Sequence, residues 1–235
     1  MAFPTTRWSL LAQATIHGDA AQGEAVGQFY RHYRGPVLSF IRQQTPDQAH
    51  AEDLMQEFFI HLINESTLQR ATPRRGRFRS FLLGALTRFL SRVRVRDAAE
   101  KRGGGKMPLS LDDPTRGIDE PVVPTSMAMA FDREWARDLL QRARKDLDTE
   151  WRARGEAEVL AVLLRFLPGA VNTPSYEEAA EALGWPQARL KTEVFRVRKQ
   201  FRELVRLEVA ITVDEPHEID TEMAHLHLVL SDPSA

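Results

Sequence analysis

Cysteine is absent from the 235 residues, which excludes disulfide bonds, thiol catalysis and cysteine-ligated zinc. No apolar run is long enough to span a membrane, and residues 1–7 do not resemble a signal peptide, so we expect a cytoplasmic protein. A phosphate-binding loop is absent as well, because the glycines at 103–105 are not followed by the Lys-Ser/Thr pair that opens a helix after such a loop. We therefore expect no cofactor.

Strand-like alternation of apolar and polar residues does not persist anywhere, whereas apolar residues recur at helical spacing in several stretches. This pattern predicts an all-α protein. Residues 103–125 are rich in Gly, Pro and Asp and cannot build a core, which predicts a flexible linker. We expect a first helical domain at 1–102, the linker at 103–126, a second helical domain at 127–207 and an acidic extension at 208–235.

Charge is distributed unevenly, although 32 Lys and Arg nearly balance 33 Asp and Glu. Basic residues concentrate between residues 74 and 102, whereas the chain after residue 207 contains acidic residues and no Lys or Arg. A dense basic run indicates a polyanionic partner, because like charges on one helix repel unless a polyanion relieves them. The acidic extension either packs on its own chain, holds off the basic surfaces by charge, or is a frayed terminus without a role.

The stretch 175–204 carries the signals of two helices separated by a tight turn. Ser175 and, three residues later, Glu178 predict a capping box, and Gly184 tolerates the positive φ that ends many helices. Pro186 suits the first turn of the next helix, where its missing N–H costs nothing. That second helix has one apolar stripe, which consists of Leu190, Val194, Val197, Phe201 and Leu204.

The side opposite this stripe is largely basic and contains Lys191, Thr192, Phe195, Arg198, Lys199 and Arg202. A short helix followed by a helix with a basic outer face is the helix-turn-helix design, in which the second helix enters the major groove of DNA. The alternative is an ordinary solvated helix in a bundle. We favour DNA binding because the turn chemistry and the basic face agree.

The first domain contains a predicted helix at 47–63, capped by Asp47, with Ala51, Leu54, Met55, Phe58 and Leu62 on its inner side. Another face of this helix gathers Asp53, Gln56, Glu57 and Ile60. An exposed isoleucine ringed by acidic and amide groups fits a docking surface. On these residues alone, a solvated acidic face with one stray apolar residue is the simpler explanation.

The basic run contains a further helix, with Phe78, Leu82, Leu86, Phe89 and Val93 on one arc. Arg77, Arg88 and Arg92 lie on the neighbouring arc. Arginines beside aromatic side chains suit phosphate contact and base stacking. Phe81 and Phe89 by themselves are better explained as core residues.

The remaining pattern predicts helices elsewhere in the chain. A short amphipathic helix is expected over Trp8, Leu10, Leu11 and Ala14, and a longer one at 23–43 with a break or kink at Pro36. Helical spacing also runs through residues 127–147 and 156–166. In the acidic extension, Met223, Leu226, Leu228, Val229 and Leu230 predict a short helix.

Several blocks, correctly ordered and spaced, resemble the sigma-70 family of RNA polymerase sigma factors, in its extracytoplasmic-function group. Residues 51–59 (AEDLMQEFF) are similar to the second conserved region of that family, and residues 77–94, which begin RFRSFLL, to the promoter-melting and minus-ten-reading segment after it. Residues 176–201 are similar to the fourth region, which reads the minus-thirty-five element. The resemblance covers roughly residues 22–206. Residues 6–11 (TRWSLL), residues 101–105 (KRGGG) and the tail resemble a subgroup common in planctomycete- and acidobacterium-like genomes.

The resemblance implies a transcription initiation factor, not an enzyme, that binds the β′ and β subunits of core RNA polymerase and directs it to promoter DNA. It implies a region 2-like helical bundle, a region 4-like helix-turn-helix and a monomer in the free state, and it leaves open a separate anti-sigma protein. Polymerase binding is implied for Asp53, Gln56, Glu57 and Ile60. DNA binding is implied for Arg77, Arg79, Ser80, Arg88, Arg92, Arg94, Arg96, Gln187, Arg189, Lys191, Thr192, Phe195, Arg196, Arg198, Lys199 and Arg202.

The chain departs from the family pattern at two places. Many members have Asn and Asp in the helix after the position of Phe81, near where this chain has Arg88 and Arg92. This difference puts the minus-ten sequence in doubt and predicts more backbone contact. In the second helix of the helix-turn-helix, Glu193 interrupts the basic face, and Phe195 contacts a thymine methyl or a sugar, or else packs against the acidic tail.

Two other classes compete with this interpretation. A helix-turn-helix regulator that works without polymerase would need neither the face at 53–60 nor a second basic unit. An enzyme with a metal site on His50, Glu52, Asp53, Glu57 and His61 is conceivable, because Glu57 and His61 are one turn apart. However, no metal-binding motif occurs and no second helix offers matching carboxylates, so we expect no catalytic and no metal-binding residue.

Overall fold

The computed structural model describes residues 20–45, 47–64, 78–101, 123–213 and 215–231, and these ranges contain helices and no strand. The predicted all-α fold class is therefore confirmed. The elements in chain order are α2 (Ala20–Arg42), α3 (Gln48–Asn64), α4 (Phe78–Lys101), α5 (Thr125–Ala153), α6 (Ala157–Leu163), η2 (Leu164–Phe166), α7 (Tyr176–Leu183), α8 (Gln187–Ala210) and α9 (Glu218–Ser231). None of these helices is both long and apolar enough to cross a membrane. The predicted helix at 8–14 and the linker residues 103–122 lie outside the described residues.

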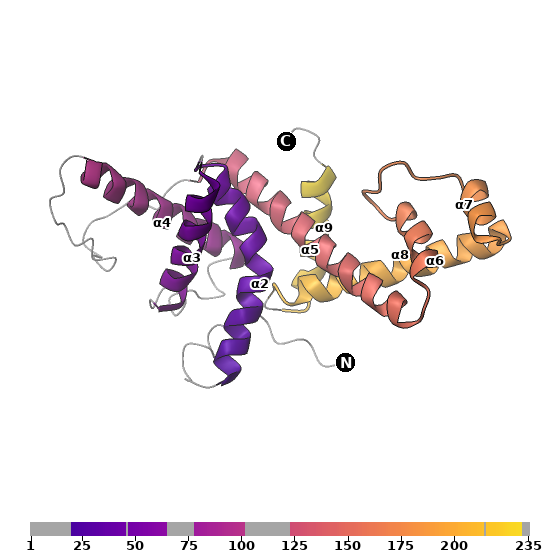
Figure 1. Ribbon diagram of the computed structural model, residues 1–235. Coiled ribbons are helices and arrows are strands. Elements are labelled where there is room, and N and C mark those ends of the chain that lie inside the picture. Colours follow the sequence, from indigo (N-terminus) through magenta and orange to yellow (C-terminus); the bar gives the residue numbers. More distant parts are fainter. Residues whose placement is uncertain (1–19, 46, 65–77, 102–122, 214, 232–235) are drawn as a thin grey trace.

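Helices α2, α3 and α4 form one group around an aromatic core (Figure 1). The ring of Phe29 on α2 lies 5.5 Å from that of Phe59 on α3, and Phe58 on α3 lies 5.5 Å from Phe89 on α4. The apolar residues predicted for the inner side of α3 are all buried. The hydrogen bond from the Ala49 N–H to the Asp47 carboxylate confirms the predicted cap of α3. This core fixes α3 and α4 as one unit, with their polar faces outward.

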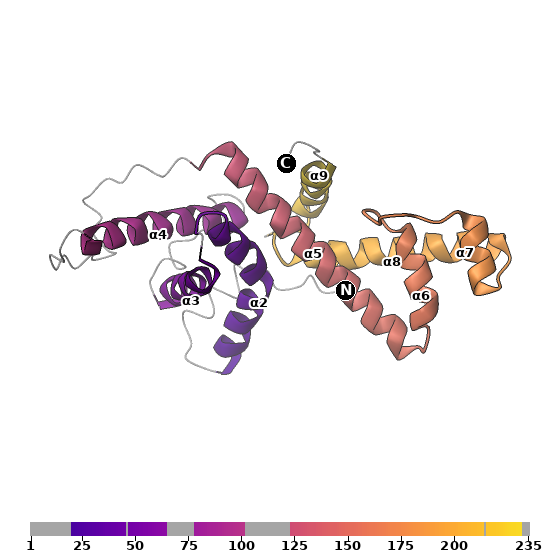
Figure 2. The same ribbon diagram turned by 45° about the horizontal axis from the view of Figure 1, so that its top comes forward.

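The long helix α5 connects the two halves of the molecule (Figures 1 and 2). Its first half packs on α2, where the Phe131 and Phe40 rings lie 5.9 Å apart. Its second half packs on α8, where the Trp151 indole donates a hydrogen bond of 3.0 Å to Gln200. The first helix of the predicted second domain therefore shares a core with both halves.

The helix is not broken at Pro36, because α2 runs without interruption from Ala20 to Arg42; the predicted alternative, a kink, stays a prediction. A proline inside a helix leaves the carbonyl of the residue four positions earlier without its usual donor. Here that carbonyl belongs to His32, and the Arg142 side chain on α5 donates to it at 3.4 Å. The neighbouring Gly35 allows α5 to come close, since a Cβ there would lie 3.1 Å from Asp138.

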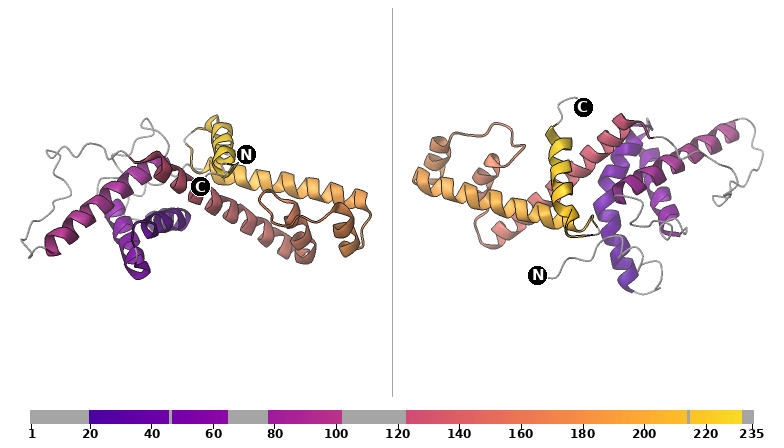
Figure 3. Two further views of the ribbon diagram at one scale, coloured as in Figure 1. Left: turned by 90° about the horizontal axis from the view of Figure 1, so that it is seen from above. Right: turned by 180° about the vertical axis from the view of Figure 1, so that it is seen from behind.

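Helices α6, α7 and α8 form the second group, at the far end from α4 (Figure 3). Residues 156–166, predicted as one helix, divide into α6 and the 3-10 turn η2. Helix α9 then folds back and packs on α5 and α8. Its Leu226 and Val229 are buried against these helices. Of the three possibilities for the acidic extension, packing on its own chain is the one observed.

Candidate nucleic-acid interface

The helix-turn-helix of α7 and α8 forms from local signals that the sequence contains. The Ser175 hydroxyl accepts from the Glu178 N–H at 3.1 Å, and the Glu178 carboxylate accepts from the Ser175 N–H at 2.8 Å, which confirms the capping box. This double contact also lowers the pKa of Glu178. Gly184 ends α7 in the left-handed region with φ 61°, and Pro186 is the N-cap of α8, one residue before its first turn.

The inner stripe of α8 is buried as predicted, with Leu190, Val194, Val197 and Phe201 in the core and Leu204 half-buried. All residues of α8 that were predicted to bind DNA are exposed, namely Gln187, Arg189, Lys191, Thr192, Phe195, Arg196, Arg198, Lys199 and Arg202. Phe195 is 69 % exposed and therefore does not pack against the C-terminal helix, which was one of its two predicted roles. Contact of this face with DNA stays a prediction.

Several of these exposed side chains already have partners within the chain. Arg198 donates from Nε and Nη2 to the Phe166 carbonyl, at 3.0 and 2.9 Å, and so closes the end of η2 against α8. Arg196 pairs with Glu193 at 2.6 Å. Arg189 lies over the Trp185 ring at 4.0 Å, which orients it along the start of α8. The Arg198 guanidinium, although exposed, therefore has a scaffold role within the chain, and its contact with DNA stays a prediction.

Helix α4 carries the second predicted DNA-binding set. Ser80 and Arg94 are exposed, and Arg88, Arg92 and Arg96 are half-buried. Arg94 donates to the Gln44 side chain, and Arg96 forms an ion pair of 2.7 Å with Glu57 on α3. Arg77 lies outside the described residues. Arg88, Arg92 and Arg96, spaced four residues apart, follow one side of the helix, whereas Arg94 lies on another side and contacts Gln44 after α2.

Arg79, which was predicted to bind DNA, is not accessible to DNA in this arrangement of the chain, and its contact with DNA stays a prediction. Arg79 is only 4 % exposed. Its Nε donates to Asp132 at 2.8 Å, its Nη1 pairs with Glu222 on α9, and its guanidinium lies 4.7 Å from the centre of the Trp135 ring. Burying a guanidinium is costly unless carboxylates neutralise it, and here two of them do so. The basic run around Arg79 gave no indication of these partners, because they come from distant helices.

The predicted docking face on α3 is exposed as expected. Asp53, Gln56, Glu57 and Ile60 all lie at the surface, and Ile60 is 58 % exposed. Because Glu57 pairs with Arg96, this face adjoins the end of α4. An apolar side chain held open among acidic and amide groups suits a protein partner better than a nucleic acid. Binding by these four residues stays a prediction. Within the described ranges, no cluster of three or more His, Asp or Glu could hold a metal ion.

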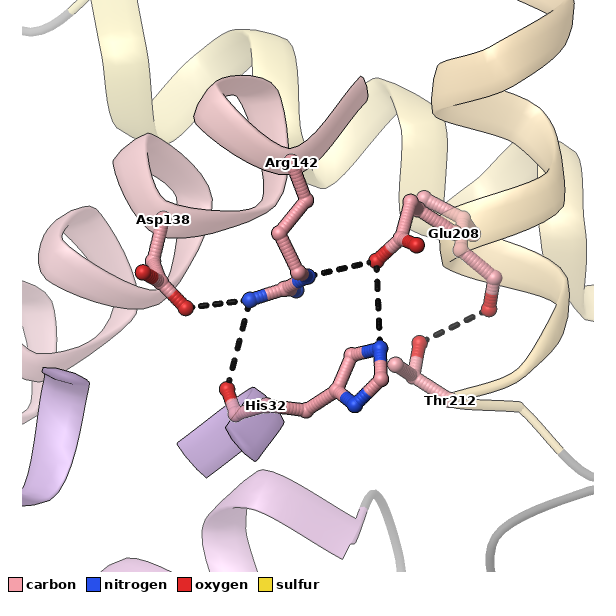
Figure 4. A network of polar contacts seen from close by, with 6 residues as sticks. His32, Asp138, Arg142, Glu208 and Thr212 are labelled. Atoms are coloured by element: carbon pink, nitrogen blue, oxygen red, sulfur yellow. Dashed lines mark hydrogen bonds and ion pairs between the residues drawn. The ribbon is translucent and has the colours of Figure 1, made fainter. Parts of the chain in front are cut away.

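A partly buried polar network, which was not predicted from the sequence, joins α2, α5 and α8 (Figure 4). Arg142 on α5 donates to Glu208 on α8 at 2.7 Å and also pairs with Asp138. The Nε2 atom of His32 lies 3.8 Å from the same Glu208 carboxylate. Nearby, the Thr212 hydroxyl donates to the Val209 carbonyl at 2.8 Å. The signal in the sequence was Glu208 itself, which falls seven residues after Phe201 on the apolar stripe.

The pKa values of the two carboxylates in this network, Glu208 and Asp138, are shifted in opposite directions. Burial by itself raises the pKa of Glu208, but its contact with His32 and the charge of Arg142 lower it to about 2. Burial raises the pKa of Asp138 above its usual value, against the opposing effect of Arg142. Glu208 is therefore the anionic partner that holds Arg142 at the junction of the two halves.

Comparison with known protein families supports the reading of the first helical group. Residues 29–99, which include α3 and most of α2 and α4, match the family model of sigma-70 region 2. Comparison with curated proteins and comparison with solved structures found no match. The matched segment contains the exposed face of α3 and the basic helix α4, so the family signal coincides with two of the surfaces described above.

Proposed function

We propose that this chain, in which residues 29–99 match sigma-70 region 2, is a sigma factor that binds core RNA polymerase, directs it to specific promoters and assists their melting. The family match supports a role in transcription initiation. The further step rests on one observation, namely that the same chain also presents a capped helix-turn-helix whose second helix has a basic outer face. Polymerase, and not this chain, would make the phosphodiester bonds.

Each surface has a role in this proposal. The exposed face of α3 with Asp53, Gln56, Glu57 and Ile60 docks on the polymerase. The arginines of α4 contact the minus-ten DNA, where Arg88 and Arg92 favour backbone contacts over base reading. The outer side of α8 enters the major groove at the minus-thirty-five element, with Lys191, Lys199 and Arg202 as phosphate contacts. Phe195 is placed to meet a thymine methyl or a sugar.

The order of the two units supports placing the chain in the extracytoplasmic-function group, in which a region 2-like unit and a region 4-like unit make up the protein. The motifs at 6–11 and 101–105, which lie outside or at the edge of the described residues, support the planctomycete- and acidobacterium-like subgroup. We expect the free protein to be a monomer, and a separate anti-sigma protein is compatible with the proposal.

Binding of the purified chain to sigma-free core polymerase tests the proposal. We expect a stoichiometric complex by native electrophoresis or fluorescence anisotropy, and this complex should bind promoter fragments that core polymerase alone does not select. Sequence-specific duplex binding by the chain alone, without any polymerase complex, would contradict the proposal. That result would instead favour a helix-turn-helix regulator that works without polymerase.

A further inference from the structure

The C-terminal helix α9 closes the chain back onto the region 2 unit. It follows α8 in sequence, yet its buried residues reach α5 and the start of α4. Leu226 and Val229 are buried, and Ile219 and Met223 are packed against the same core. Figure 3 shows α9 standing across the junction of α5 and α8. The helix is therefore docked by an apolar face and is not a loose acidic tail.

Two side chains of α9 contact Arg79 or its carboxylate partner. Glu222, which is 3 % exposed, pairs with Arg79 on α4. His225 lies 2.9 Å from the second oxygen of Asp132, whose first oxygen accepts from Arg79 at 2.8 Å. Arg133, beside Asp132, donates to the Val229 carbonyl at 3.4 Å. Two successive turns of α9 thus contact Arg79 or the residues that hold it.

The other acidic contact of α9 is of a different kind. Asp220 pairs with Arg206 on α8, but the Asp220 side chain is 80 % exposed and the pair lies at the surface. Exposed pairs contribute little, whereas removal of one partner from a buried pair leaves an uncompensated charge. The hold of α9 on the rest of the chain therefore depends on Glu222 far more than on Asp220.

We propose that α9 is an autoinhibitory latch, in which the Glu222 carboxylate occupies the side of Arg79 that a promoter phosphate takes when α9 is released. This proposal rests on the proposed function for its consequence, but not for the latch itself. A carboxylate and a phosphate compete for the same guanidinium donors. While α9 is docked, the basic helix α4 begins with a neutralised, buried arginine. When α9 leaves, Asp132 and Trp135 still orient Arg79, and its outer side is open to DNA.

Release of α9 can be measured without reference to DNA or polymerase. Because the chain contains no cysteine, Ser91→Cys on α4 and His227→Cys on α9 give two unique labelling sites, both exposed. We expect a single narrow distribution of distances between spin labels in the otherwise native chain. Glu222→Lys should add a population of longer distances, and Asp220→Lys, with the same charge change two residues away, should not. Unchanged distances in folded Glu222→Lys would overturn the latch.

The inhibitory role is tested on forked promoter DNA with the full-length chain. We expect Glu222→Lys to bind the fork roughly tenfold more tightly than Asp220→Lys, a coupling of the usual size for two linked sites. The added substitution Arg79→Ala should abolish that gain. Equal affinities of the two lysine variants, or a gain that survives Arg79→Ala, would overturn the inhibitory role.

The two proposals fail in different ways. Longer distances in Glu222→Lys, combined with no transcription by core polymerase for any variant, would contradict the sigma function and leave the latch in place. Promoter-specific transcription with unchanged distances in Glu222→Lys would support the sigma function and contradict the latch. Lower promoter-specific transcription by Glu222→Lys than by Asp220→Lys would show that docked α9 belongs to the active form, and would overturn inhibition.

Discussion

The basic residues on the two candidate DNA-binding helices differ in what they contact within the chain. Arg79 pairs with Asp132, and Arg198 donates to the Phe166 carbonyl. Arg96 and Arg196 form ion pairs with nearby glutamates. Lys191, Lys199 and Arg202 extend from the outer side of α8, and of these Lys191 lies 5.9 Å from the centre of the Tyr176 ring. A basic side chain at the surface that neither forms an ion pair nor donates to a carbonyl is the better candidate for a phosphate contact. The sequence shows the charge of each residue but not this distinction, which depends on carbonyls and carboxylates from distant segments.

Replacing Lys191 and Lys199 together by alanine should weaken DNA binding without changing the fold. Each phosphate contact contributes about 0.9 to the slope of log affinity against log salt, so the double variant should lose about 2 from that slope. Fluorescence anisotropy across a salt series measures it. Glu181→Ala on α7, also exposed, serves as a surface control. An unaltered slope would contradict the assignment of this face.

Arg198→Ala should act mainly on stability. The Phe166 carbonyl would lose both of its guanidinium donors, and we expect the free energy of unfolding to fall by about 1 kcal/mol. Urea unfolding followed by circular dichroism measures the change. A variant of native stability whose DNA salt slope drops as much as that of a lysine variant would instead show that Arg198 is a DNA contact.

Glu208 should make stability depend on acid pH. Its pKa in the folded chain is about 2, below the ordinary value of 4.5, so its contribution is present above pH 4.5 and is lost as the pH falls toward 2. His32 on α2 and Arg142, Asp138 and Asp146 on α5 face it. Protonation of Asp138, whose pKa is raised, relieves a burial cost and opposes part of the loss.

We therefore expect Glu208→Gln to lower the free energy of unfolding by on the order of 2 kcal/mol near pH 6 and by less than about half as much near pH 3. Urea unfolding of both chains at the two pH values measures the difference. A destabilisation of the same size at both pH values would show that the glutamate acts by shape or hydrogen bonding and not through its charge.

At the scale of elements, the helices with complete local signals were predicted best. The α7 and α8 pair carries its own cap, its left-handed glycine and its apolar stripe, and all three are found. The continuity of α2 through Pro36 was not predictable, because the donor for the His32 carbonyl comes from Arg142, far along the chain. Burial of Glu222 was signalled only by its spacing from Leu226 and Val229, which is compatible with a surface position as well.

The exposed residues of α3 should contribute to polymerase binding but little to the stability of the fold. We expect Asp53→Ala combined with Glu57→Ala to change the free energy of unfolding by less than about 1 kcal/mol, since the Glu57–Arg96 pair is exposed. The same double variant should bind core polymerase at least roughly tenfold more weakly, because truncating important side chains at the centre of an interface commonly costs more than about 1 kcal/mol of binding free energy. Glu52→Ala, on the same helix but paired with Arg42, is the control. Native affinity of the folded double variant would remove this face from the docking surface.

At the scale of the molecule, α5 joins the two halves that the sequence suggested would be independent. Phe131 packs on the α2 side and Trp151 on the α8 side of the same helix. The network around Glu208 and the contacts of Glu222 both lie at this junction. Contacts between segments more than 60 residues apart cannot be read from local periodicity, which explains why the helices were predicted and their assembly was not.

In-vitro transcription tests the central claim most directly. Purified chain is added to sigma-free core polymerase on a pooled library of candidate promoters, beside the Asp53→Ala, Glu57→Ala variant and the Lys191→Ala, Lys199→Ala variant. We predict promoter-specific transcripts that appear only with the chain and decrease with either variant. An absence of specific transcripts, also when Glu222→Lys releases the C-terminal helix, would contradict the account of this protein as a sigma factor.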